Sequence, residues 1–291
     1  GGQRLSSSVV VSQTVAELRA RLDAERSAGR TIGLVPTMGA LHGGHASLVA
    51  RALSMCDVVV TSIFVNPRQF GPGEDLGSYP KMLDDDIGAL ADLGCQHVWI
   101  PSTGEMYPEG YGTRVELDGP TDVLCGVTRA THFGGVLTVV LKLFNQVGPE
   151  VAFFGQKAYQ QALLIRLMVR DLDVPVRIEV CPTVREPDGL AMSSRNRYLS
   201  PEEREQAAAL NRTLGALEEA WRAGETDAAR LMGFARAFIG RSPLVRIDYL
   251  EIRDPATLAV RDGPVRAGDL VAVAAFVGSA RLIDNRQLTD G

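Results

Sequence analysis

Two of the chain's four histidines, His42 and His45, lie three residues apart in the stretch PTMGALHGGHASLV at residues 36–49. Such a pair could bind a metal ion, pack as ordinary core residues, or hold a phosphate group. A metal site needs a third and usually a fourth ligand, and no suitably spaced partner follows, so we expect no metal held by the protein's own side chains. The flanking glycines indicate close backbone approach rather than a core position. The stretch therefore predicts a phosphate-binding turn, where helix N–H groups and two imidazoles donate hydrogen bonds.

A second cluster of polar side chains, Ser193, Ser194 and Arg195, lies in AMSSRNRYLS at residues 191–200. Taken alone, this segment reads as a linker that caps a helix. Together with the histidine turn, it matches the paired pattern of nucleotidyl-transferring α/β enzymes, which activate a carboxylate or phosphate with ATP. The pair of segments therefore indicates nucleotide chemistry.

Three further side chains follow apolar, strand-like runs. Lys157 lies between Gly155 and a predicted helix start, in the predicted crevice. Most lysines are solvated surface residues, but at this position we expect a contact with phosphate. Asn66 and Gln69 end another strand, where neutral amides suit a small substrate with hydroxyl and carboxylate groups. Turn capping is the alternative role, which fits Asn66 better than Gln69.

These residues depend on an alternation of strands and helices between residues 31 and 184. The expected strands are 31–38, 57–65, 97–101, 151–155 and 176–184, and the expected helices begin near 14, 45, 82, 131 and 158. This alternation predicts a Rossmann-like parallel sheet with helices on both faces. Ligands bind such sheets at the carboxyl ends of the strands, so the polar segments should converge on one crevice.

The pattern changes after Arg197, and the domain boundary is expected near residues 185 to 199. Ser200-Pro-Glu-Glu203 combines an N-cap, a proline at the first helical position and a capping-box glutamate, which predicts a long helix to about residue 223. A helix from about Asp227 and three antiparallel strands follow. We therefore predict two domains, a Rossmann-like domain at 1–185 for nucleotide and acid binding and a smaller α+β lid domain at 186–291.

Composition restricts the classes of partner. The net charge of −5 and the pI near 5.5 argue against general affinity for nucleic acid. No apolar run approaches the ~18 residues that a membrane-spanning helix needs, and the first residues lack a signal-peptide pattern. Four scattered cysteines favour a reducing compartment over a disulfide framework. We expect a cytoplasmic protein whose partners are small molecules.

Over nearly its whole length the sequence resembles the pantoate–β-alanine ligase family. The shared segments are PTMGALHxGH, SIFVNPxQF, the following Tyr-Pro, HFxGVLTVV, FFGxKxYQQ, PTVRExDGLAMSSRNxYL and RLIDN, in family order and spacing. The resemblance implies a two-step reaction within coenzyme A biosynthesis. Pantoate attacks ATP to give pantoyl adenylate and pyrophosphate, and the amine of β-alanine then displaces AMP to form pantothenate.

The resemblance also implies a role for each residue. His42 and His45 would stabilise the reacting phosphates, and Lys157, Ser193, Ser194 and Arg195 would hold the phosphate chain with Mg²⁺ bridging its oxygens. Gln69 and Gln161 would bind pantoate beside Asn66. The residues framing the nucleotide would be Pro36, Met38, Gly155, Val184 and Met192. Members of the family are usually homodimers.

Four positions depart from the family pattern. Gly43 replaces a glutamate in the usual HEGH, Gln156 and Ala158 replace the acids of GEKD, and Cys125 replaces the glutamate of LEG. Two alternatives to a pantothenate-forming ligase therefore remain. One is a diverged paralogue that joins another acid to another amine. The other is a homologue that binds nucleotide or pantoate without turnover.

Overall fold

The computed structural model describes residues 8–71, 74, 76, 82–127, 129 and 131–291. The Tyr79-Pro80 motif and much of the 71–78 loop, whose closure the sequence leaves open, lie outside these residues. The chain forms two compact units. The first comprises the chain up to Thr121 together with 126–155 and 161–181, and the second comprises 122–125, 156–160 and 182–291. The domain limits expected from the sequence, 1–185 and 186–291, remain a prediction.

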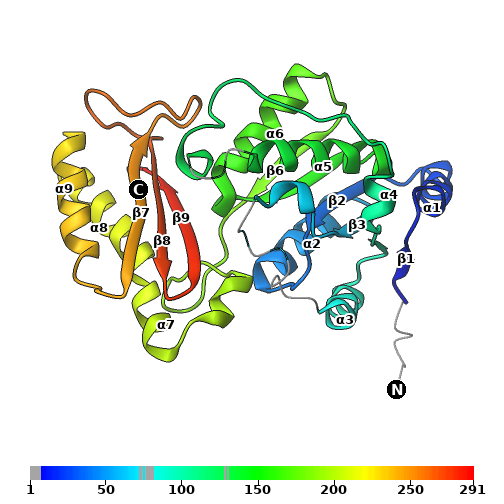
Figure 1. The fold of residues 1–291 in the computed structure, drawn as a ribbon, viewed down its shortest axis with the longest axis horizontal. Coiled ribbons are helices and arrows are strands. Elements are labelled where there is room, and N and C mark those ends of the chain that lie inside the picture. Colours follow the sequence, from blue (N-terminus) through cyan, green and yellow to red (C-terminus); the bar gives the residue numbers. More distant parts are fainter. Residues whose placement is uncertain (1–7, 72–73, 75, 77–81, 128, 130) are drawn as a thin grey trace. The chain divides into compact units, whose positions relative to one another are not determined.

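The first unit contains a six-stranded parallel sheet in the order β1-β4-β3-β2-β5-β6 (Figure 1). The strands are β1 Val10–Ser12, β2 Ile32–Thr37, β3 Val58–Ile63, β4 His97–Trp99, β5 Val151–Gly155 and β6 Arg177–Cys181. Every residue of β3 is buried, as expected for a β-branched central strand covered on both faces. The chain leaves β2 toward β3 and later returns to its other side at β5, so the carboxyl ends of β2 and β5 flank a topological switch point.

Helices cover both faces of this sheet, which confirms the predicted fold class. They are α1 Val15–Ser27, α2 Gly43–Met55, α3 Leu83–Leu93, α4 Thr103–Met106, α5 His132–Val147 and α6 Tyr159–Asp171. Figure 1 shows α5 and α6 on one side of the strands and α2 and α3 on the other. In the same way, α1 packs on α5 and α2 packs on α3. Right-handed crossovers require this division of helices between the faces.

The second unit is a small α+β structure, also as predicted. Its helices are α7 Pro201–Ala207, α8 Ala209–Arg222 and α9 Ala228–Ile239, and its antiparallel strands are β7 Val245–Arg253, β8 Leu270–Val277 and β9 Ala280–Gln287. Leu214, Leu217 and Leu231 pack with the buried valines of β8 in one core. No helix among the described residues is long and apolar enough to cross a membrane.

The structure differs from the sequence expectations at three elements. The helix predicted to run from residue 201 to about 223 is interrupted at Ala208. The helix expected to begin near His45 begins at Gly43, because the His42 side chain serves as its N-cap. The edge strand β1 was not predicted. It pairs with β4, which is far away in sequence, and no local sequence pattern predicts that pairing.

Candidate active site

The histidine turn is built on an unusual backbone at the end of β2. Gly39 and Ala40 both have positive φ values, 83° and 51°, the left-handed region that L side chains rarely adopt. A side chain at Gly39 would place Cβ only 3.0 Å from the Asp86 carboxylate and 3.2 Å from Ile63. Glycine is therefore required here for two independent reasons, backbone conformation and space.

Asp86 of α3 holds this turn in place. Its carboxylate accepts hydrogen bonds from the backbone N–H groups of Ala40, at 2.8 Å, and Leu41, at 2.9 Å. The side chain is buried, so these bonds compensate the cost of removing its charge from water. Sequence reasoning missed Asp86, because it follows two further acids, Asp84 and Asp85, at the start of a helix.

The two imidazoles have defined tautomers. Nδ1 of His42 accepts from the Gly44 N–H at 3.0 Å, and Nδ1 of His45 accepts from the His42 N–H at 3.1 Å. A nitrogen that accepts from an N–H carries no proton itself, so the proton of each neutral ring is on Nε2. The ring centroids lie 4.1 Å apart. The turn therefore carries two neighbouring Nε2–H donors at the start of α2.

On the acid side, the Asn66 amide uses all of its hydrogen-bonding capacity within the protein. Its Nδ2 donates to Gln69 Oε1 at 3.1 Å and to the Gly135 carbonyl at 3.0 Å. Its Oδ1 accepts from the Arg68 N–H at 3.2 Å and from the Tyr107 hydroxyl at 2.8 Å. An amide offers two donors and two lone pairs, so Asn66 is fully engaged. This arrangement suits a residue that orients its neighbours.

Gln69 is buried and oriented by that network. Because its Oε1 accepts from Asn66, its Nε2 is the group that remains for donation, and Nε2 contacts Met38 Sδ at 3.3 Å. The backbone carbonyl oxygen of Gln69 lies 3.0 Å from Nδ1 of His132. A thioether is a weak acceptor, so a carboxylate or hydroxyl oxygen would be a better partner for this amide. The predicted acid-binding residues Asn66 and Gln69 and the nucleotide-framing residue Met38 therefore lie together.

The other predicted residues of the first unit lie on neighbouring elements. Pro36 is in β2 opposite Ser62 of β3, and Gln161 is half-buried in the first turn of α6. Gly155 ends β5, and no described heavy atom lies within 4 Å of the place where its Cβ would be. The carboxyl end of β5 therefore leaves room at the switch point.

Lys157 belongs to the second unit and lies in the short 3₁₀ turn Gln156–Ala158. Its Nζ donates to the Met192 carbonyl at 3.1 Å. Burial lowers the pKa of Lys157 to about 8, the Asp284 carboxylate raises it, and the Arg195 charge lowers it further. Burial of the ammonium group therefore outweighs the attraction of the Asp284 carboxylate, and a nearby anion would favour the charged form.

Asn285 fixes the turn that carries Lys157. Its Nδ2 donates to the carbonyls of Gln156, at 3.0 Å, and Lys157, at 2.9 Å, while Gln156 Nε2 reaches Asn285 Oδ1 at 3.4 Å. The preceding residue, Asp284, forms an ion pair with Arg185 at 2.6 Å. The closing RLIDN segment thus positions the lysine, a role that its sequence did not reveal.

The serine-rich segment is ordered and partly used as a cap. Ser193 caps the 3₁₀ helix Ser194–Tyr198 by accepting from the Arg195 N–H at 3.2 Å. The Met192 N–H donates to the Val184 carbonyl at 3.0 Å, so these two residues, both predicted to frame the nucleotide, lie together. The helix-capping interpretation of this segment is therefore correct, and it is compatible with an anion-binding role for the remaining groups.

Two of the departures from the family pattern can be placed in the structure. Cys125 Sγ lies 3.3 Å from the Tyr249 hydroxyl and 3.8 Å from the Arg281 guanidinium, which also pairs with Asp248. Gly43 is exposed at the first position of α2. Neither residue is a partner in the hydrogen bonds given above for the two histidines and Gln69.

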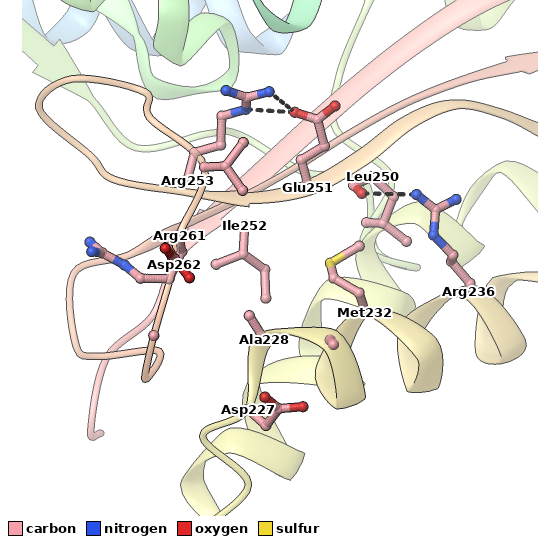
Figure 2. Close-up of a pocket in the computed structure, with 13 residues that line it drawn as sticks. Asp227, Ala228, Met232, Arg236, Leu250, Glu251, Ile252, Arg253, Arg261 and Asp262 are labelled. Carbon is pink, nitrogen blue, oxygen red and sulfur yellow. Dashed lines mark hydrogen bonds and ion pairs between the residues drawn. The ribbon is translucent and has the colours of Figure 1, made fainter.

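A separate pocket of about 510 Å³ lies in the second unit beside α9 and β7 (Figure 2). Met232, Leu250 and Ile252 contribute apolar side chains, and the Glu251–Arg253 ion pair lies among its lining residues. No residue predicted for the reaction lines it. Across the described part of the chain, no group of three or more His, Cys, Asp or Glu side chains could hold a metal ion.

Comparison with known proteins agrees with this arrangement. A family model described as pantoate-beta-alanine ligase matches residues 10–287. Pantothenate synthetase 1 of Bradyrhizobium diazoefficiens is 51% identical over 271 residues, which is 93% of this chain and 95% of that protein.

Two solved structures are also similar. The crystal structure of pantothenate synthetase from Thermus thermophilus has a TM-score of 0.91 at 47% identity, covering 96% of this chain and 99% of that one. The pantoate-beta-alanine ligase of Francisella tularensis, crystallised with beta-gamma ATP and beta-alanine, has a TM-score of 0.78 at 33% identity, covering 97% and 99%. The match spans both units of the fold, and the chain belongs to the pantoate–β-alanine ligase family.

Proposed function

We propose that this enzyme uses ATP to condense pantoate with β-alanine in two steps. In the first, a pantoate carboxylate oxygen attacks the α-phosphorus of ATP, the bond to the β-phosphate breaks, and pyrophosphate leaves. In the second, the β-alanine amine attacks the acyl carbon of pantoyl adenylate and the bond from that carbon to the bridging oxygen breaks. AMP leaves with this oxygen, and the nitrogen loses a proton. The products are pantothenate, AMP and pyrophosphate.

The observation that carries this proposal is the pair of Nε2–H donors in the histidine turn. Negative charge grows on the phosphate oxygens during displacement at phosphorus, and preorganised donors stabilise that charge more than they stabilise the ground state. His42 and His45 are held by backbone N–H groups and by the turn that Asp86 braces. They therefore need little rearrangement as the reaction proceeds.

On the acid side, Gln69 and Gln161 are the residues proposed to bind pantoate, with Asn66 beside them. The orientation of Gln69 supports this assignment. Its Oε1 accepts from Asn66, and its Nε2 donates only to the weak acceptor Met38 Sδ among the hydrogen bonds described above. A donor amide suits a substrate whose polar groups are a carboxylate and hydroxyls. The site is thus selective for oxygen acceptors.

On the nucleotide side, Lys157, Ser193, Ser194 and Arg195 are proposed to bind the phosphates, and Pro36, Met38, Gly155, Val184 and Met192 to frame the nucleotide. The depressed pKa of Lys157 supports this role, because a phosphate would supply the negative charge that its surroundings lack.

Mg²⁺ is proposed to accompany ATP rather than to occupy a site of the protein's own. Magnesium is commonly bound by substrate phosphates with one or two carboxylates and several waters. The donors proposed to bind phosphate, His42, His45 and Lys157, would suit an ion carried in on the phosphates of ATP. The ion would neutralise charge on the phosphate oxygens.

The quaternary structure and location are proposed from the family resemblance. We propose a homodimer in the cytoplasm. Light scattering should then give twice the 31.3 kDa mass of the chain. A monomeric mass at micromolar concentration would contradict the dimer.

A panel of acids and amines tests the proposed function against the paralogue alternative. AMP formation from ATP would be measured for pantoate and related hydroxy acids, each with β-alanine and with other small amines. We expect pantoate with β-alanine to give the highest kcat/KM. A higher value for another pair would identify a diverged paralogue. If none of the tested pairs gave AMP, the protein would be a homologue that binds without turnover.

A further inference from the structure

Tyr107 lies beside the proposed acid pocket, although nothing in its sequence context points to the reaction. It directly follows α4 and is half-buried. Its hydroxyl donates to Asn66 Oδ1 at 2.8 Å, which is the shortest of the four hydrogen bonds made by that amide. Tyr107 therefore contacts the residue that orients Gln69.

The ring of Tyr107 is held independently of its hydroxyl. The Arg68 guanidinium lies 4.4 Å above its centroid, and the Tyr111 ring meets it edge-on at 5.0 Å. Lys142 adds a second cation, 4.8 Å from Tyr111 and 6.0 Å from Tyr107. Cation–π and edge-to-face contacts of this kind restrain a ring even when its polar group is removed.

The hydroxyl supports one orientation of the Asn66 amide. The Arg68 N–H can only donate and the Gly135 carbonyl can only accept, so they require oxygen at Oδ1 and place Nδ2 toward Gln69 Oε1. The Tyr107 hydroxyl donates to the same Oδ1 and so strengthens this orientation. Gln69 must then present its NH₂ group rather than its oxygen toward a substrate. If the Asn66 amide turned, Gln69 could turn as well and would offer an oxygen to the substrate carboxylate, which is repulsive.

We propose that Tyr107 is a positioning residue for the hydroxy acid and acts through Asn66 on Gln69. The proposal rests on the proposed function, in which Gln69 binds pantoate. In this assignment Tyr107 helps to keep the NH₂ group of Gln69 toward the substrate, so that this position favours an oxygen acceptor on the substrate. Tyr107 touches neither ATP nor the reacting atoms in this assignment, so its removal should affect use of the acid alone.

Steady-state kinetics of Tyr107→Phe test this assignment. The variant keeps the ring contacts and loses one neutral hydrogen bond, so the KM for pantoate should rise about two- to tenfold, while the KM for ATP stays within about twofold. Tyr111→Phe is the matched control, because Tyr111 shares the same cations but forms no hydrogen bond with Asn66 within the described part of the chain. It should leave both KM values within about twofold of wild type.

A double-variant cycle with Gln69→Ala distinguishes positioning from a general packing effect. Gln69→Ala should raise the KM for pantoate about tenfold or more, and adding Tyr107→Phe to it should change that value by less than about twofold. Multiplying effects, an equal rise in the KM for ATP, or a wild-type KM in Tyr107→Phe would each overturn the positioning role. Wild-type pantoate kinetics in Gln69→Ala would instead overturn the proposed acid pocket, and the positioning role with it.

Discussion

At the scale of single residues, the His42 side chain combines a structural and a chemical feature. Its Nδ1 caps α2 through the Gly44 N–H, and its Nε2 carries the proton proposed to interact with phosphate. A cap of this kind contributes about 0.5–2 kcal/mol to stability. Any loss of turnover on mutation could therefore come from either nitrogen, unless the substitution separates them.

His42→Asn and His42→Ala separate the two features. Asparagine is among the best N-cap residues, so His42→Asn should unfold near the wild-type temperature, whereas His42→Ala should lose about 0.5–2 kcal/mol. Both variants lack the imidazole donor, so both should lower kcat on the order of 10²–10³-fold. Thermal unfolding and turnover would be measured side by side. A wild-type rate in His42→Asn would show that the imidazole serves only as a cap.

The pH dependence of ATP use should reflect Lys157. Its pKa of about 8 means that the free enzyme carries the cation below pH 8 and loses it as the pH rises further. Because kcat/KM reports ionisations of the free enzyme, kcat/KM for ATP should fall as the pH rises above about 8. Lys157→Gln should have a much lower value with no such fall. A wild-type profile that stays flat to pH 10 would contradict a phosphate-binding role for this lysine.

At the scale of elements, the turn between β2 and α2 depends on α3. Asp86 holds two successive backbone N–H groups of a turn that contains two left-handed residues. Without both acceptor oxygens, the turn would have to leave one buried N–H without a partner, at a cost of about 1–3 kcal/mol. The position of the histidines therefore depends on a residue of another helix.

Asp86→Asn tests this dependence. The amide turns one acceptor oxygen into an NH₂ group, which cannot accept from the backbone, so kcat should fall at least about tenfold while the KM for pantoate changes little. Asp85→Asn is the matched control on the exposed side of the same helix turn and should behave as wild type. Equal rates in Asp86→Asn and Asp85→Asn would indicate that the turn holds its shape without the carboxylate.

The sequence predicted elements wherever the determining interaction is local. Ser200 and Glu203 form the expected reciprocal cap, and α9 begins directly after Asp227, where a helix was expected. It could not reveal β1, whose three residues form a strand only by pairing with β4. In the proposed site, motifs point to the histidines and Gln69, whereas no motif points to Asp86 or Tyr107. An acid in a run of acids and a tyrosine in a loop become informative only once the chain is folded.

At the scale of the whole molecule, the proposed residues are divided between the two units. His42, His45, Asn66, Gln69 and Gln161 belong to the first, and Lys157 with the 193–195 segment belongs to the second. Asn285 and Asp284 connect the β9 strand to the Lys157 turn within the second unit. The departure at Gln156 is accommodated by the same asparagine, so the altered corner keeps a defined structure.

The central claim is that pantoate is activated as an acyl adenylate, and the fate of its carboxylate oxygens tests that claim most directly. Pantoate labelled with ¹⁸O in the carboxylate would be converted with ATP and β-alanine, and the products analysed by mass spectrometry. Attack on the α-phosphorus followed by amide formation must leave one labelled oxygen in AMP, with none in pyrophosphate. Unlabelled AMP, or formation of ADP with labelled inorganic phosphate, would contradict the proposed mechanism.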